Sequence, residues 1–152
     1  MKKTLRFISI FLVCALVFAL TACGASSYPS KENVVFEGSG VKIIYTGVDL
    51  KGNVLGPQIK FRIENNSGYD LTVQTRKTSV NGYTLGDLDV IMSTDVKNGE
   101  KANGTMLFLN STLKDNNITA LKNVVTSFHM FYMGQYASHY LDTKIVTVLN
   151  VE

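Results

Sequence analysis

Two histidines and a carboxylate are the side chains in this sequence best suited to hold a metal ion. His129, His139 and Asp142 fall within a stretch of fourteen residues, and the chain has no other histidine. A catalytic zinc needs three such ligands at about 2.0 to 2.2 Å and one open position. The spacing matches no zinc signature, and a strand histidine is more often half-exposed surface. The sequence therefore favours no metal here, and whether these residues bind an ion is left open.

A second set of oxygen ligands surrounds Asp87 and Asp89. These residues would share one face of a strand, with Asp95 and Asn98 following, so calcium ligands could converge there. The two aspartates also alternate with apolar residues, so they can equally form the solvated face of a strand. Calcium binding is the less favoured interpretation.

Aromatic side chains are densest between residues 128 and 140. Rings on both faces of one strand cannot all enter one core, and an exposed tyrosine offers an apolar face and a hydroxyl to sugar or peptide. The candidate ligand-binding residues are Tyr132, Tyr136 and Tyr140. We expect any compact site to lie in this Tyr-rich region and to require no metal. The alternative is that one set of rings packs inward while the other covers the sheet edge.

The N-terminal segment has the three parts of a secretory signal peptide. Its basic start contains Lys2, Lys3 and Arg6. A run of apolar residues interrupted only by Ser9 follows from Phe7 to Leu20, and small residues lead to Cys23. The run of 14 residues is only about 21 Å long as a helix, shorter than a hydrocarbon core of about 30 Å. Residues 1–22 are therefore expected to be removed rather than to stay as a membrane span.

The junction Leu20-Thr21-Ala22-Cys23 resembles the lipobox of bacterial lipoproteins, in which the cysteine thiol takes a diacylglycerol before cleavage. The resemblance implies lipidation of Cys23. Two or three acyl chains anchor a protein stably where a single chain is marginal. We expect the mature protein to be held by lipid on the extracellular face of a bacterial cell membrane, with residues 23–38 forming a flexible linker.

The charge of the mature chain argues against nucleic-acid binding. Three of the 15 basic residues lie in the expected signal peptide, which leaves 12 against 12 acidic residues. DNA or RNA recognition needs clustered Lys and Arg, which a balanced chain does not supply. No nucleic-acid partner is expected.

Recognisable catalytic motifs are missing from the sequence. It contains no G-x-S-x-G elbow, P-loop or H-E-x-x-H motif. Its two cysteines leave with the signal peptide (Cys14) or carry lipid (Cys23), so no thiol nucleophile remains. The protein is expected to be no enzyme and to use no cofactor. Paired carboxylates for glycoside hydrolysis stay an open alternative, and a metal-dependent hydrolase is the least favoured one.

From Val41 onward, short segments alternate apolar and polar residues between turn formers, as antiparallel strands with one buried face do. The clearest is Gln58 to Asn65, and Asn81-Gly82 favours a two-residue hairpin turn. The other predicted strands are Val41 to Val48, Leu71 to Val80, Asp87 to Met92, Gly104 to Leu109, Val124 to Met133 and Lys144 to Val151. One or two helical turns capped by Thr112 are expected within Ser111 to Ala120. Seven or eight strands at this spacing predict an all-β sandwich or barrel.

Several turns and core alternations occur in a recognisable order. They are Gly56-Pro57-Gln58-Ile59, Glu64-Asn65-Asn66, Ser79 to Tyr83, Lys97 to Asn103 and Ser127 to Met130. This order resembles a family of immunoglobulin-like, telokin-type domains in surface lipoproteins of Gram-positive bacteria, which has no assigned activity. The likeness spans about residues 41 to 150. It implies one immunoglobulin-like antiparallel β-sandwich domain over residues 39–152, and it supplies no catalytic residue.

These features together predict a membrane-anchored extracellular lipoprotein that acts as a non-catalytic binding or protein-interaction module. Its partner would be a protein or a cell-wall component. The alternative is a receptor for a small ligand or cell-wall carbohydrate that uses the Tyr-rich region. A pocket lined by tyrosines would favour the receptor, and an exposed edge or apolar patch would favour protein interaction.

Overall fold

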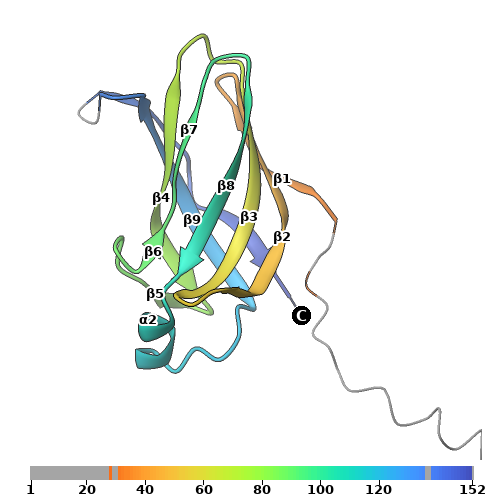
Figure 1. Ribbon diagram of the computed structural model, residues 1–152, viewed down its shortest axis with the longest axis vertical. Coiled ribbons are helices and arrows are strands. Elements are labelled where there is room, and N and C mark those ends of the chain that lie inside the picture. Colours follow the sequence, from red (N-terminus) through yellow and green to blue (C-terminus); the bar gives the residue numbers. More distant parts are fainter. Residues whose placement is uncertain (1–27, 29–30, 136–137, 152) are drawn as a thin grey trace, which may run out of the picture.

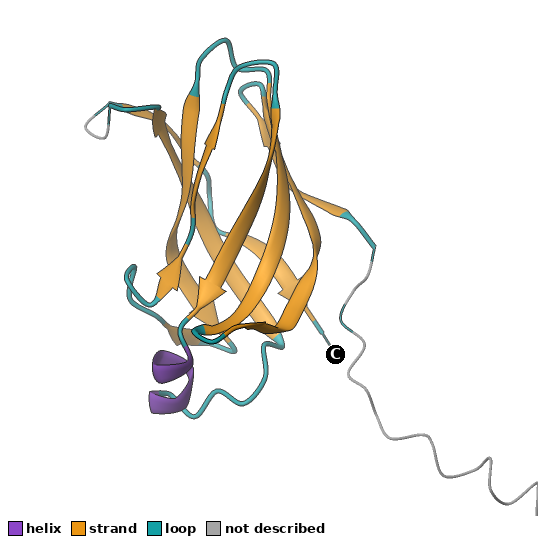
Figure 2. Cartoon of the chain, viewed as in Figure 1, coloured by secondary structure: helices purple, strands orange, loops and turns teal. Residues whose placement is uncertain are grey.

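Two antiparallel β-sheets pack face to face in the computed structural model, which describes residues 28, 31–135 and 138–151 (Figure 1). One short helix lies at an end of the sandwich, and strands make up most of the rest (Figure 2). The predicted all-β antiparallel sandwich with one short helix is therefore confirmed. No helix among the described residues has the length and hydropathy of a membrane span.

The sheets have five and six strands. The five-stranded sheet has the order β1 (Asn33–Gly38), β2 (Val41–Asn53), β3 (Gly56–Asn65), β8 (Lys101–Phe108) and β6 (Val90–Ile91). The six-stranded sheet has the order β10 (His139–Asp142), β9 (Asn123–Tyr132), β4 (Leu71–Val80) and β5 (Tyr83–Thr84), with β11 (Val146–Asn150) beside β9 and β7 (Ser93–Val96) beside β4. The described residues thus form more strands than the seven or eight predicted. The additional strands include short ones of two to four residues, which are too short to show an alternating pattern.

Strand β3 carries the centre of the core. Its inward residues Ile59, Phe61 and Ile63 are 0%, 1% and 0% exposed, as the alternation predicted. The Phe61 ring meets the Phe128 ring of β9 edge to face, with centroids 5.7 Å apart. This contact joins the two sheets, because β3 and β9 belong to different layers.

The domain begins earlier than predicted. Residues 33–38 were expected to belong to a flexible linker, but they form β1 and pair with β2 as an edge strand. Strand β2 is also longer than expected and continues to Asn53 through a register irregularity after Asp49. Within this extension, Gly52 donates its backbone N–H to Asp49 Oδ1 at 2.9 Å. The β2–β3 turn is therefore only Val54 and Leu55.

The chain crosses between the two sheets at Met92. Strand β6 pairs with β8 in one sheet and β7 pairs with β4 in the other, and the buried Met92 lies between them. The predicted strand from Asp87 to Met92 is wrong over its first half, because Asp87 and Asp89 lie in a turn. The hairpin turn predicted at Asn81-Gly82 is confirmed, with φ of 51° and 87°.

Helix α2 (Asn110–Asp115) follows β8 directly. Leu109 occupies its N-cap without a side-chain hydrogen bond, so the predicted cap at Thr112 is wrong. Thr112 lies inside the helix and donates its hydroxyl to Asp89 Oδ1 at 2.8 Å. This bond holds α2 against the turn that precedes β6.

Candidate functional site

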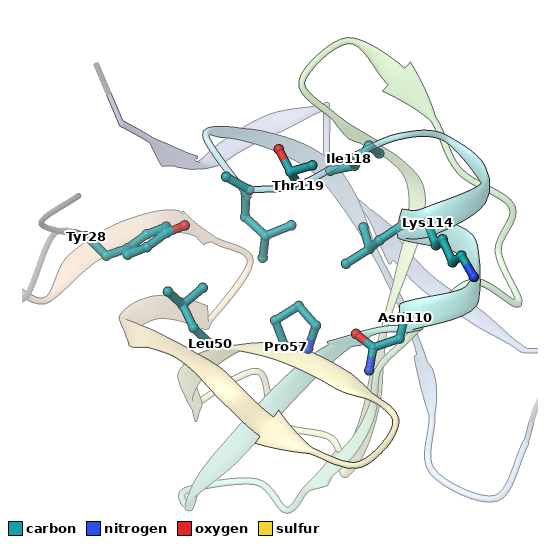
Figure 3. A pocket seen from close by; sticks show the side chains of 10 residues that line it. Tyr28, Leu50, Pro57, Asn110, Lys114, Ile118 and Thr119 are labelled. Atoms are coloured by element: carbon teal, nitrogen blue, oxygen red, sulfur yellow. The ribbon is translucent and has the colours of Figure 1, made fainter. Parts of the chain in front are cut away.

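A cleft of 560 Å³ opens between helix α2, the β2–β3 hairpin and the segment that leads from α2 to β9. Its lining is Tyr28, Leu50, Pro57, Asn110, Leu113, Lys114 and residues 118–121. Leu50 and Pro57 face Ile118 and Thr119 across the opening, while Tyr28 lies on one side and Asn110 on the other (Figure 3). Lys114 is the one charged side chain among these described residues. The cleft is therefore suited to an apolar ligand or side chain.

The first wall of the cleft is built by close backbone packing. Gly56 lies against the strand end that precedes α2, so that a Cβ placed on it would be 1.9 Å from Phe108 O. Asn110 donates its backbone N–H to Leu55 O at 2.8 Å. These two contacts attach the hairpin tip to the start of the helix.

The second wall is held by the side chain of Asn81. Its Nδ2 donates to Ala120 O at 2.7 Å, and its Oδ1 accepts the backbone N–H groups of Lys122 and Asn123 at 3.0 and 2.9 Å. Ile118 donates its N–H to Leu113 O at 2.8 Å and so continues the helix end. The residue that makes the β4–β5 turn thus also fixes the segment between α2 and β9.

Exposed apolar side chains gather beside the cleft. Leu50 and Leu55 are each 52% exposed and Val54 is 94% exposed. Val54 and Leu55 form the hairpin tip, where the backbone carbonyl of Leu55 accepts the hydrogen bond from the first residue of α2. Exposed apolar side chains that gather at a hairpin tip beside a cleft are typical of a contact surface for a partner.

The Tyr-rich region is only partly an exposed surface. Tyr132 and Tyr140 are half-buried, lie with ring centroids 5.7 Å apart, and pack against the core. Tyr140 also donates its hydroxyl to Ser39 O at 2.8 Å. Tyr136 lies outside the described residues.

The sequence did not single out Tyr69, which joins this cluster. Its ring centroid lies 5.1 Å from that of Tyr132 and 5.8 Å from that of Tyr140, and it is 52% exposed. Asn65 Nδ2 donates to Tyr69 O at 2.7 Å and so fixes the loop between β3 and β4. Tyr69 lies in a loop, so no hydrophobic periodicity indicates that it contacts two strand tyrosines. The one feature of the sequence that could have indicated its exposure is its place directly after the turn formers Ser67 and Gly68.

His129, His139 and Asp142 come together on the outer face of the six-stranded sheet. Nδ1 of His129 lies 2.5 Å from Asp142 Oδ1, and Nε2 of His139 lies 3.3 Å from Asp142 Oδ2. The two imidazole rings stack with centroids 5.4 Å apart. The hydrogen bond with His129 is the main reason that the pKa of the Asp142 carboxyl is lowered from its ordinary value.

Asp87 and Asp89 direct their carboxylates to separate hydrogen-bond donors and ion-pair partners of the protein. Asp87 accepts the backbone N–H of Lys77 and pairs with Arg76, while Asp89 accepts from Gly86 N and the Thr112 hydroxyl. Asp95 accepts the hydroxyl of Thr72 in a separate contact. These carboxylates hold turns and strands in place.

The lipidation residue Cys23 lies outside the described residues. Comparison with protein families, curated proteins and solved structures finds no match to this chain. Its function is therefore inferred from its own fold and side-chain geometry.

Proposed function

We propose that this protein is a lipid-anchored extracellular binding module without catalytic activity, and that its cleft beside α2 receives an apolar segment of a partner protein. The observation that carries the proposal is the combination of a mostly apolar cleft of 560 Å³, whose lining includes the exposed Leu50, with the exposed Val54 and Leu55 at the neighbouring hairpin tip. Such a surface costs free energy in water, which a bound partner recovers by burying it. The lipobox at Leu20 to Cys23 supports the membrane attachment.

Anchoring depends on the Cys23 thiol in this proposal. The variant Cys23→Ala should lose lipid and shift from the detergent phase to the aqueous phase after phase separation, or remain as uncleaved precursor. Immunoblots of both phases measure the partition and the chain length. Detergent-phase partitioning of a fully processed Cys23→Ala protein would contradict the proposal.

The binding surface is tested by Leu50→Ser, because Leu50 lines the cleft and is half-exposed, so its loss should spare the fold. Losing one apolar contact of this size should weaken partner binding by about 1 to 2 kcal/mol, or roughly 5- to 30-fold. Partners are cross-linked in the membranes of the native cells, captured, and quantified by mass spectrometry. The matched control is Leu88→Ser, since Leu88 is 88% exposed and not among the cleft residues.

A receptor for a small ligand or carbohydrate is the second candidate function, favoured by the aromatic cluster of Tyr69, Tyr132 and Tyr140. The same capture experiment separates the two candidates through Tyr69→Ala, because Tyr69 is as exposed as Leu50 but belongs to the Tyr cluster. Loss of binding in Leu50→Ser alone supports the cleft. Loss in Tyr69→Ala alone would move the site to the tyrosines.

A further inference from the structure

A β-bulge brings both histidines and the carboxylate to one face of the sheet. His139 and Asp142 are three residues apart, and in a regular strand an odd spacing places two side chains on opposite faces. The pairing of β10 with β9 shifts register between His139 and Leu141, which adds the residue that returns both side chains to one face. Asp142 is also the direct cross-strand partner of His129.

We propose that His129, His139 and Asp142 form a binding site for a divalent transition metal ion of the Zn²⁺ type. The three ligand atoms lie within 4.8 Å of one another. Ligand atoms on a tetrahedral zinc, at bonds of about 2.0 to 2.1 Å, lie about 3.3 Å apart. Closing the set requires a movement of at most about 1.5 Å, which rotation of the exposed side chains of His139 and Asp142 supplies without moving the strands. Imidazole and carboxylate are suitable ligands for zinc, and three protein ligands leave one coordination position open.

An open coordination position on this ion would face a groove whose cationic side chains favour an anionic ligand of the metal. His129 and Asp142 also line a groove of 590 Å³, together with Arg76, Lys77 and Lys144. This groove shares no residue with the cleft beside α2. The metal proposal is therefore independent of the proposed partner binding, and either can fail alone.

The test uses the full-length chain in detergent micelles, stripped of metal with EDTA and titrated with ZnCl2 in a calorimeter. The wild-type protein should bind one Zn²⁺ per chain at this site. His139→Ala and Asp142→Asn should each weaken that binding at least about 100-fold, because even the loss of an outer hydrogen-bond partner of a metal ligand costs about 10- to 100-fold. Asp142→Asn keeps the shape of the side chain and an oxygen that can accept a hydrogen bond from histidine. A loss of Zn²⁺ affinity of this size in Asp142→Asn therefore indicates that Asp142 is itself a metal ligand.

Asp87→Asn is the matched control, since Asp87 lines the same groove but is not one of the three ligands. It should bind Zn²⁺ as the wild type does. Titration with Co²⁺ adds a second readout, because tetrahedral coordination by nitrogen and oxygen gives visible bands without a thiolate charge-transfer band from the cysteines. Absence of Zn²⁺ binding, or equal affinity in the wild type and both ligand variants, would overturn the proposal.

Discussion

Phe61→Ala should lower the free energy of unfolding by about 3 to 5 kcal/mol, the cost of removing a buried aromatic ring from a packed core. Phe61 is 1% exposed and its ring makes the edge-to-face contact with Phe128 that joins the sheets. The cavity would lie between two layers that the other buried core side chains hold apart, so it could not close fully. Urea denaturation followed by circular dichroism measures the change.

Lys60→Ala is the control on the same strand. Lys60 is half-buried and points away from the core, so its replacement should change stability by less than about 0.5 kcal/mol. Equal and small losses in both variants would show that Phe61 does not join the sheets as described.

Gly56→Ala should be destabilising by a comparable amount, about 2 to 6 kcal/mol, for a different reason. The new Cβ would lie 1.9 Å from Phe108 O and 3.1 Å from Asn110 N, and both of these are backbone atoms that cannot rotate away. The φ of 154° adds conformational strain to this overlap, each effect costing about 1 to 3 kcal/mol. The hairpin tip should also separate from α2, so the cleft should change shape.

Gly82→Ala is the matched control, because Gly82 also has a positive φ but a Cβ there meets no atom within 4 Å. It should cost only about 1 kcal/mol, the strain of the left-handed conformation. Thermal unfolding measured side by side ranks the two variants. A Gly56→Ala protein as stable as Gly82→Ala would contradict the close approach of the hairpin to the helix.

Alternation predicted the fold where a strand has one buried and one solvated face. Strand β3 is such a strand, and the Asn81-Gly82 turn has local chemistry that a sequence carries directly. Strand β1 was missed because its residues are partly exposed and become a strand only by pairing with β2. Thr112 resembled a cap because its hydroxyl can accept a backbone N–H, but the folded chain directs it to Asp89.

The candidate sites were harder to predict than the strands, because each depends on how different elements pack or pair with one another. The cleft combines Tyr28 and Leu50 with residues 110–121, and no single periodicity spans them. The two histidines and Asp142 were noticed as a set, but their convergence depends on a bulge that has no signature in the residues themselves. Tyr69 lies in the loop between β3 and β4, where no alternation indicates its contact with Tyr132.

The position of Tyr28 in the cleft has a consequence for how a partner would be found. Tyr28 is five residues from Cys23, a distance of at most about 18 Å along an extended chain. Under the proposed lipid anchoring, the cleft therefore lies close to the bilayer, and a partner held in the same bilayer meets it by lateral diffusion at a high effective concentration. Individually weak contacts suffice under these conditions. Such a complex would persist in intact membranes and dissociate once detergent dilutes both proteins.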